Sequence, residues 1–221
     1  MTKRLAVLSA LAVCWVSPAS AQYALPTPYA AMPSDRPLSD NDKAREMLNQ
    51  YGYCVVMQHL GGVQRALALG DDAATDGALR KLATDDCLFA GKLRMSPPLF
   101  RGAIYRAMYV REFGYLSQGA RAAVIPANGQ PGEEVDAAPS ITFGGCVAKL
   151  APAAARDLVM ATPASRNEDA ALATLRPTLA DCLPPKQQVR LTRWGLQATV
   201  AEALYKRTVA LSDKTRAVGA K

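Results

Sequence analysis

Apolar residues recur at helical spacing along most of the chain, and no stretch alternates apolar and polar residues for long. The clearest example begins at Ser96-Pro97, a pair typical of an N-cap and the first position of a helix. Apolar residues then follow at i, i+4, i+7 and i+8: Phe100, Ile104, Ala107 and Met108. The pattern predicts an all-α fold, with no strands beyond a short pair.

This pattern recurs 96 residues later, where Thr192 precedes Leu196, Val200, Ala203 and Leu204. Two earlier segments recur as well: Tyr51–Val55 resembles Phe143–Val147, and Asp86-Cys87-Leu88 resembles Asp181-Cys182-Leu183. The offset is 92 residues at the first cysteine and 95 at the second. Ordered matches over about 60 residues predict an internal duplication, although a composition rich in Ala and Leu raises the similarity of any two segments.

Proline and glycine cluster before the first copy and between the two copies, as they do in linkers and loops. We therefore expect two tandem small helical repeats. The predicted segments are a signal peptide (1–21), a Pro-rich disordered leader (22–38), helical repeat 1 (39–113), a linker (114–140), helical repeat 2 (141–211) and a basic tail (212–221).

Local signals also predict where helices begin and end. Ser39 precedes Asp40 and Asp42 and predicts a helix start, and Ser165 and Glu168 have the spacing of a capping box. Gly61-Gly62 is expected to interrupt a helix. In each copy the second helix is expected to run to the second cysteine, and Tyr109 and Tyr205 are expected to pack in a core or an interface.

The first 21 residues have the order of a secretory signal peptide. Lys3 and Arg4 precede a short apolar segment, 5–16, and Ala19-Ser20-Ala21 provides a small-residue cleavage site. The alternative is an apolar N-terminal helix of the fold. We predict cleavage and export to the periplasm or the medium. No apolar run of about 18 residues is present, so we expect no transmembrane segment in the mature chain.

Cys14 lies inside this apolar segment, where Leu11-Ala12-Val13-Cys14 partly resembles a lipoprotein processing box. Val13 is larger than the small residue that precedes the cysteine in such boxes, and cleavage there would cut within the apolar segment. We expect a soluble exported protein. Lipid modification at Cys14 is the alternative, and the intact mass of the mature protein distinguishes the two.

The mature chain then has four cysteines: Cys54, Cys87, Cys146 and Cys182. An even count in an exported protein indicates disulfides, and four cysteines allow three pairings. The duplication favours one bridge in each copy, Cys54–Cys87 and Cys146–Cys182, because antiparallel neighbouring helices bring such ends together. A zinc site is the weaker alternative, since the chain has no Cys-x-x-Cys pair and one histidine.

Composition excludes several kinds of chemistry. The chain has 221 residues, and its one histidine, His59, is on an apolar segment with no Gly-x-Ser-x-Gly turn anywhere. We therefore expect a structural His59 and no serine hydrolase. The sequence identifies no catalytic residue, no cofactor site and no metal site.

Acidic residues leave two-carboxylate hydrolysis open, because a sequence does not place carboxylates in space. Asp86 and Asp181 precede the second cysteines, and we expect them to cap a loop or to pair with Arg94 or Arg190. Glu112 and Glu202 belong to the last helix of each copy and are expected to face outward, and Glu133-Glu134 is expected to be solvated linker charge.

The charge of the chain is moderately basic. The formal net charge is +7, and loss of Lys3 and Arg4 with the signal peptide leaves 24 basic against 19 acidic residues, or +5. This suits weak attraction to anionic envelope surfaces, or ordinary solubility. Three arginines, Arg101, Arg106 and Arg111, are spaced by five residues, so they form no basic stripe and we expect no nucleic-acid binding.

Aromatic-Gly-x-Cys-Val, then Asp-Cys-Leu, then a helix ending near Ala-(Met/Leu)-Tyr, over residues 45–210, resembles small exported proteins of alphaproteobacteria of the sphingomonad kind. That family is uncharacterised. The resemblance implies export and a helical, cysteine-bridged repeat, but no activity and no catalytic residue.

These observations predict a non-catalytic protein that binds or supports an envelope component (a protein, a peptide or an anionic glycan) through the groove between the copies. The competing hypothesis is an envelope hydrolase that uses acidic residues without histidine. A purely structural or stress-protective protein is a third. Two close carboxylates in a deep cleft would favour the hydrolase, whereas a shallow apolar or basic groove would favour binding.

Overall fold

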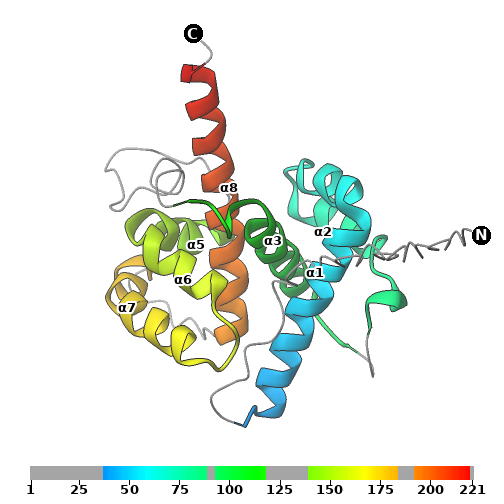
Figure 1. The fold of residues 1–221 in the computed structure, drawn as a ribbon, viewed down its shortest axis with the longest axis horizontal. Coiled ribbons are helices and arrows are strands. Elements are labelled where there is room, and N and C mark those ends of the chain that lie inside the picture. Colours follow the sequence, from blue (N-terminus) through cyan, green and yellow to red (C-terminus); the bar gives the residue numbers. More distant parts are fainter. Residues whose placement is uncertain (1–36, 89–92, 118–138, 184–191, 220–221) are drawn as a thin grey trace, which may run out of the picture. The chain divides into compact units, whose positions relative to one another are not determined.

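The computed structural model describes residues 37–88, 93–117, 139–183 and 192–219, all within one unit of the chain, residues 31–221. Its elements are α1 (Asp40–Leu67), α2 (Asp72–Arg80), the 3-10 turn η1 (Asp85–Cys87), α3 (Pro97–Phe113), α5 (Pro139–Leu150), α6 (Pro152–Met160), α7 (Arg166–Cys182) and α8 (Arg193–Gly219) (Figure 1). These residues contain no strand, so the all-α prediction is confirmed. None of the described helices has the length and apolar character needed to cross a bilayer.

The helices begin where local sequence signals place them. The Ser39 hydroxyl accepts a hydrogen bond from the Asp42 amide at 3.2 Å, and the Ser165 hydroxyl accepts one from the Glu168 amide at 3.2 Å. Such bonds satisfy backbone donors that have no partner within the first turn. Ser96 occupies the predicted N-cap position of α3 without a side-chain bond.

The helix is not interrupted at Gly61-Gly62, as the sequence predicted, but is kinked two residues earlier. One helix, α1, covers the whole segment and departs from helical geometry at His59, with φ −127° and ψ 33°. In the second half the break between α5 and α6 falls at Ala151, with φ −134° and ψ 59°. Pro152 explains that break, because a proline disfavours helical geometry in the residue before it.

Both predicted disulfides are present. Cys54–Cys87 has a Cα–Cα separation of 5.6 Å and Cys146–Cys182 one of 5.7 Å. The expectation that a helix runs to the second cysteine is right for α7 and wrong for the first half, where α2 ends at Arg80. There Cys87 lies in η1, whose N-cap is Thr84, because the Thr84 hydroxyl accepts a hydrogen bond from the Asp86 amide.

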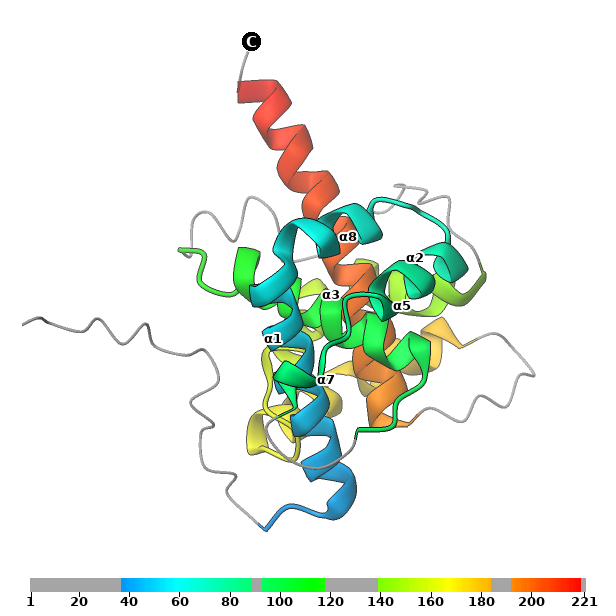
Figure 2. The ribbon, with the colours of Figure 1, turned by 90° about the vertical axis from the view of Figure 1, so that its right-hand side faces the viewer.

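The apolar core forms two clusters. One contains buried residues of α1, α2, η1 and one side of α3, and the other contains buried residues of α5 to α8. Helix α3 contributes to both, because Tyr105, Tyr109 and Phe113, which recur every four residues, belong to the second cluster. Figures 1 and 2 place α3 between α1 and α8. The expectation that Tyr109 packs in a core is confirmed.

Helices α3 and α8 approach each other closely at Gly102. A Cβ on Gly102 would lie 2.3 Å from the Cβ of Ala198, closer than real Cβ contacts. The two small residues, which are 96 residues apart in the sequence, therefore face each other and allow the backbones to meet. This crossing positions the site described below.

Helix α8 continues to Gly219, so the segment predicted as a basic tail, 212–221, is helical as far as the structure describes it. Its C-terminal turns contain alanine, lysine and arginine, which favour helix. In both views this end of α8 extends past the other helices (Figures 1 and 2). The predicted signal peptide, Cys14, most of the leader, Glu133-Glu134 and most of the linker, and Arg190 lie outside the described residues.

Candidate functional site

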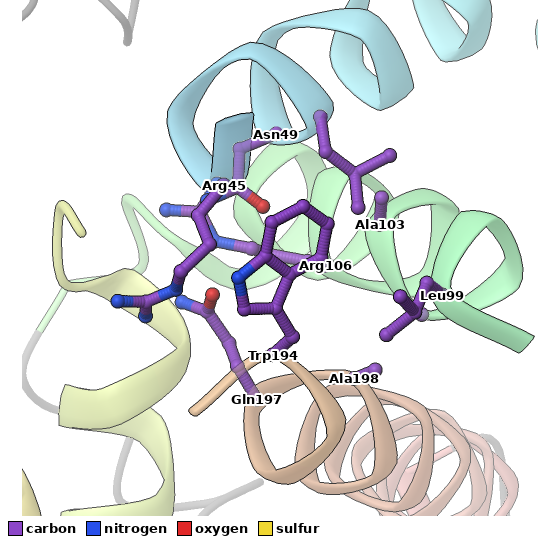
Figure 3. A pocket seen from close by; sticks show the side chains of 10 residues that line it. Arg45, Asn49, Leu99, Ala103, Arg106, Trp194, Gln197 and Ala198 are labelled. Carbon is purple, nitrogen blue, oxygen red and sulfur yellow. The ribbon is translucent and has the colours of Figure 1, made fainter. Parts of the chain in front are cut away.

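A small polar pocket lies where α1, α3 and α8 meet (Figure 3). Its volume of about 20 Å³ accommodates roughly one water-sized group. Its lining comprises Arg45, Leu48, Asn49, Leu99, Gly102, Ala103, Arg106, Trp194, Gln197 and Ala198. Small residues leave this space open, because Gly102 and Ala198 meet on its wall without longer side chains to fill it.

Helix α1 contributes two buried polar side chains, Arg45 and Asn49, which lie one helical turn apart and therefore on the same face. Their exposed fractions are 3% and 6%. Neither the Nε of Arg45 nor the Nδ2 of Asn49 has a hydrogen-bond partner within the described structure. Unsatisfied buried donors are uncommon and costly, so these two atoms mark a place where a ligand or water would be bound.

Helices α3 and α8 supply the remaining polar groups. The Nη2 of Arg106 donates to the carbonyl of Ala161 at 3.2 Å, and the Nε2 of Gln197 donates to the carbonyl of Leu158 at 3.3 Å. These bonds connect the pocket wall to the end of α6 and fix both side chains. Trp194 is half-buried, and Figure 3 shows its ring within the pocket, with its nitrogen turned toward the side where Arg45 and Gln197 lie.

The guanidinium of Arg45 is held by Glu168 of α7, whose side chain is fully buried. Both Nη atoms of Arg45 donate to that carboxylate, and Nη1 also donates to Asp42 at 3.1 Å. The Glu168 carboxylate further accepts from the amide of Ala164 at 2.8 Å and from Arg193 at 3.2 Å. A hydrogen bond from the Ser39 hydroxyl is the largest cause of a lowered pKa of Asp42. Burial opposes it, and Arg45 lowers that pKa further. Both Nη atoms of Arg45 thus bond to carboxylates, while its Nε is left for the pocket.

Ala164 has φ 60°, a left-handed conformation that is uncommon for a residue with a Cβ. This conformation lets its amide reach Glu168, instead of the Ser165 amide that a standard capping box would use. Sequence spacing thus predicted the start of α7 but not the contact of Glu168 with α1.

A second ionic cluster surrounds Arg101 at the contact of α2, α3 and α8. Arg101 donates to Asp76 at 2.7 Å, to Asp72 at 2.8 Å and to Glu202 at 3.2 Å. Burial lowers the pKa of Arg101, but the three carboxylates outweigh it and raise that pKa above its ordinary value. Lys206 also donates to Glu202, at 2.6 Å. Two cations, Arg101 and Lys206, thus hold three carboxylates, and the cluster connects three helices.

The predicted outward positions of the two glutamates are wrong. Glu202 is 8% exposed, since it contacts Arg101 across the α3–α8 contact. Glu112 is partly buried and accepts a hydrogen bond from the Tyr205 hydroxyl at 3.1 Å. Burial first, and then Glu112, raise the pKa of Tyr205.

The other candidates do not come together. Asp86 and Arg94 are both exposed and form no ion pair with each other, and Thr84 makes the capping bond at η1 instead. Asp181 is exposed at the end of α7. His59 lies at the kink of α1. Among the described residues, no group of three His, Cys, Asp or Glu side chains has the placement to hold a metal ion.

Sequence reasoning missed several residues of the pocket, among them the polar or aromatic Arg45, Asn49, Trp194 and Gln197. One signal was available, because Arg45 and Asn49 share a helical face with the buried Leu48. Polar side chains on an otherwise apolar face are candidates for a built polar site.

No protein-family model, no curated protein and no solved structure matches this chain. The resemblance to exported alphaproteobacterial proteins therefore stays a prediction. The class that the fold defines is a disulfide-bonded helical protein with a small polar pocket.

Proposed function

We propose that this protein is exported and binds a component of the cell envelope without catalysis. The observation that carries the proposal is the composition of the pocket wall, which has two guanidinium and two amide side chains and no carboxylate. A wall of this kind suits recognition of an anionic or hydrogen-bond-accepting group. Two disulfides suit an oxidising compartment, as the signal-peptide pattern at residues 1–21 also does.

The competing hydrolase hypothesis needs a carboxylate that can transfer a proton or attack a substrate. The carboxylates that lie together, Asp72, Asp76 and Glu202, all bond to Arg101. Glu168 is likewise bonded to two arginines and is fully buried. These contacts favour structural roles for these acidic groups.

We further propose that the two halves descend from a duplication of one helical unit. Three pairs of features at matching positions support it. The helical breaks fall at His59 and Ala151, which are 92 residues apart, and each half has its own disulfide. In each half a glycine of the first helix packs against the last helix, Gly52 against Ala103 and Gly144 against Thr199. On this proposal the pocket lies between the copies, with α1 and α3 from one and α8 from the other.

Crosslinking in intact cells of the native host tests the binding function. We expect cleavage before Gln22, recovery of the protein in the periplasm or the medium, and one envelope component enriched with the oxidised protein but not with a reduced, unfolded control. A chain that stays uncleaved in the cytosol, or no enriched component, would refute the proposal. Release of soluble fragments from isolated envelopes would favour the hydrolase instead.

A further inference from the structure

The pocket contains two buried donors that nothing in the described structure satisfies, Arg45 Nε and Asn49 Nδ2. Both side chains come from α1 and both line the same cavity. A bound group that accepts hydrogen bonds would remove the cost of burying them. The question is therefore which acceptor has the right charge, size and surroundings.

We propose that the pocket binds a carboxylate group attached to a small apolar moiety. A carboxylate at neutral pH only accepts hydrogen bonds, and its charge strengthens those from a guanidinium. The wall offers no carboxylate to a cationic ligand. A volume of about 20 Å³ has room for about one water-sized group, such as one oxygen of a carboxylate. This deepens the proposed function, because the carboxylate would belong to the envelope component.

The apolar part of the lining defines what adjoins the carboxylate. Leu48, Leu99 and Ala103 provide aliphatic surface beside the polar groups. Leu99 and Trp194 are partly exposed, so ligand entry is expected on their side. A short aliphatic carboxylate such as propionate reproduces both parts of the expected ligand and serves as the probe.

Trp194 reports directly on the pocket. The chain has two tryptophans, so Trp15→Phe in the full chain leaves Trp194 as the single emitter. At constant ionic strength, sodium propionate should change its fluorescence saturably, whereas ethylammonium chloride should not. Equal responses to all salts, or no response to propionate, would mean that the pocket holds water alone and would overturn the proposal. Tighter saturable binding of phosphate than of propionate would overturn the carboxylate assignment.

Two variants of Asn49 and one control test the donor itself. Asn49→Asp removes a donor and adds a negative charge, and Asn49→Leu removes the amide without adding charge. Each should weaken propionate binding about tenfold or more, the effect of a lost hydrogen bond to a charged group. Asn41→Asp makes the same change at an exposed position of α1 and should leave binding within about twofold.

Folding of each variant is checked by circular dichroism and thermal unfolding. Asn49→Leu is expected to stay folded, because an apolar side chain of similar size has no donor to satisfy. Propionate binding that is unchanged in a folded Asn49→Leu protein would overturn the proposal.

The carboxylate site and the proposed envelope-binding function can be refuted independently of each other. Propionate binding without a crosslinked envelope component would keep the pocket and refute the envelope function. A crosslinked component without propionate binding would keep the function and refute the carboxylate site.

Discussion

Replacing Gly102 by alanine would test how far the α3–α8 crossing determines stability. The new Cβ would lie 2.3 Å from the Cβ of Ala198 and 2.6 Å from its Cα, whereas ordinary Cβ contacts begin at 3.4 Å. The Cα belongs to the backbone of α8 and cannot rotate away. The helices would therefore have to separate by roughly 1 Å, which disturbs close packing along the whole contact.

The magnitude follows from two opposing effects. Overpacking costs about 1–3 kcal/mol, and the upper end applies because backbone is involved. Alanine gains about 1 kcal/mol over glycine in a helix interior. We expect a net loss of about 2 kcal/mol in the free energy of unfolding. For a protein of this size that lowers Tm by about 4–8 °C.

Urea and thermal unfolding followed by circular dichroism measure this change. Gly77→Ala is the matched control, since Gly77 lies in α2 with nothing within 4 Å of its Cβ position, and it should gain about 0.5–1 kcal/mol. In a double-mutant cycle, Ala198→Gly should relieve part of the cost of Gly102→Ala. Stabilisation by Gly102→Ala, or strict additivity in the cycle, would refute the reasoning.

Three other perturbations have defined outcomes. Replacing Cys54 and Cys87 together by alanine opens a 33-residue loop and should lower the free energy of unfolding by about 4 kcal/mol if chain entropy dominates, and a denaturant midpoint equal to that of the parent would contradict this. Glu168→Gln leaves a buried guanidinium, that of Arg45, without its main counter-charge and should cost about 3–5 kcal/mol by urea unfolding, whereas a loss below about 1 kcal/mol would mean that Asp42 and the other contacts of Arg45 suffice. Burial, as the largest cause, raises the pKa of Tyr105 and Tyr205, and Glu202 raises it further for Tyr105 and Glu112 for Tyr205. Both tyrosines therefore make their full contribution to the free energy of unfolding below pH 10.0, which is the unfolded pKa. Above that pH the free energy of unfolding falls by about 1.4 kcal/mol per pH unit for each tyrosine. Tyrosinate absorbance should then rise together with loss of helical dichroism, and ionisation of both tyrosines in the folded protein would contradict the assignment.

The sequence alone predicted the helical class, two helix starts and the pairing of the four cysteines. Ser39 and Ser165 each accept a hydrogen bond from an amide three residues away, so a few neighbouring residues are enough to predict these helix starts. The cysteine pairing followed from matching segments, which restrict the choice among three pairings. The position of the α1 kink was missed by two residues, because nothing local distinguishes His59 from its neighbours.

Only the tertiary structure decided which polar side chains are buried and what they contact. Arg45 reaches Glu168 across 123 residues of sequence, and Arg101 reaches Glu202 across 101. Burial depends on which helices pack together. A periodic pattern predicts the apolar face of a helix but not which other helix packs against that face. The sequence therefore determined the helices and their covalent links, while the packing of α1, α3 and α8 created the polar pocket.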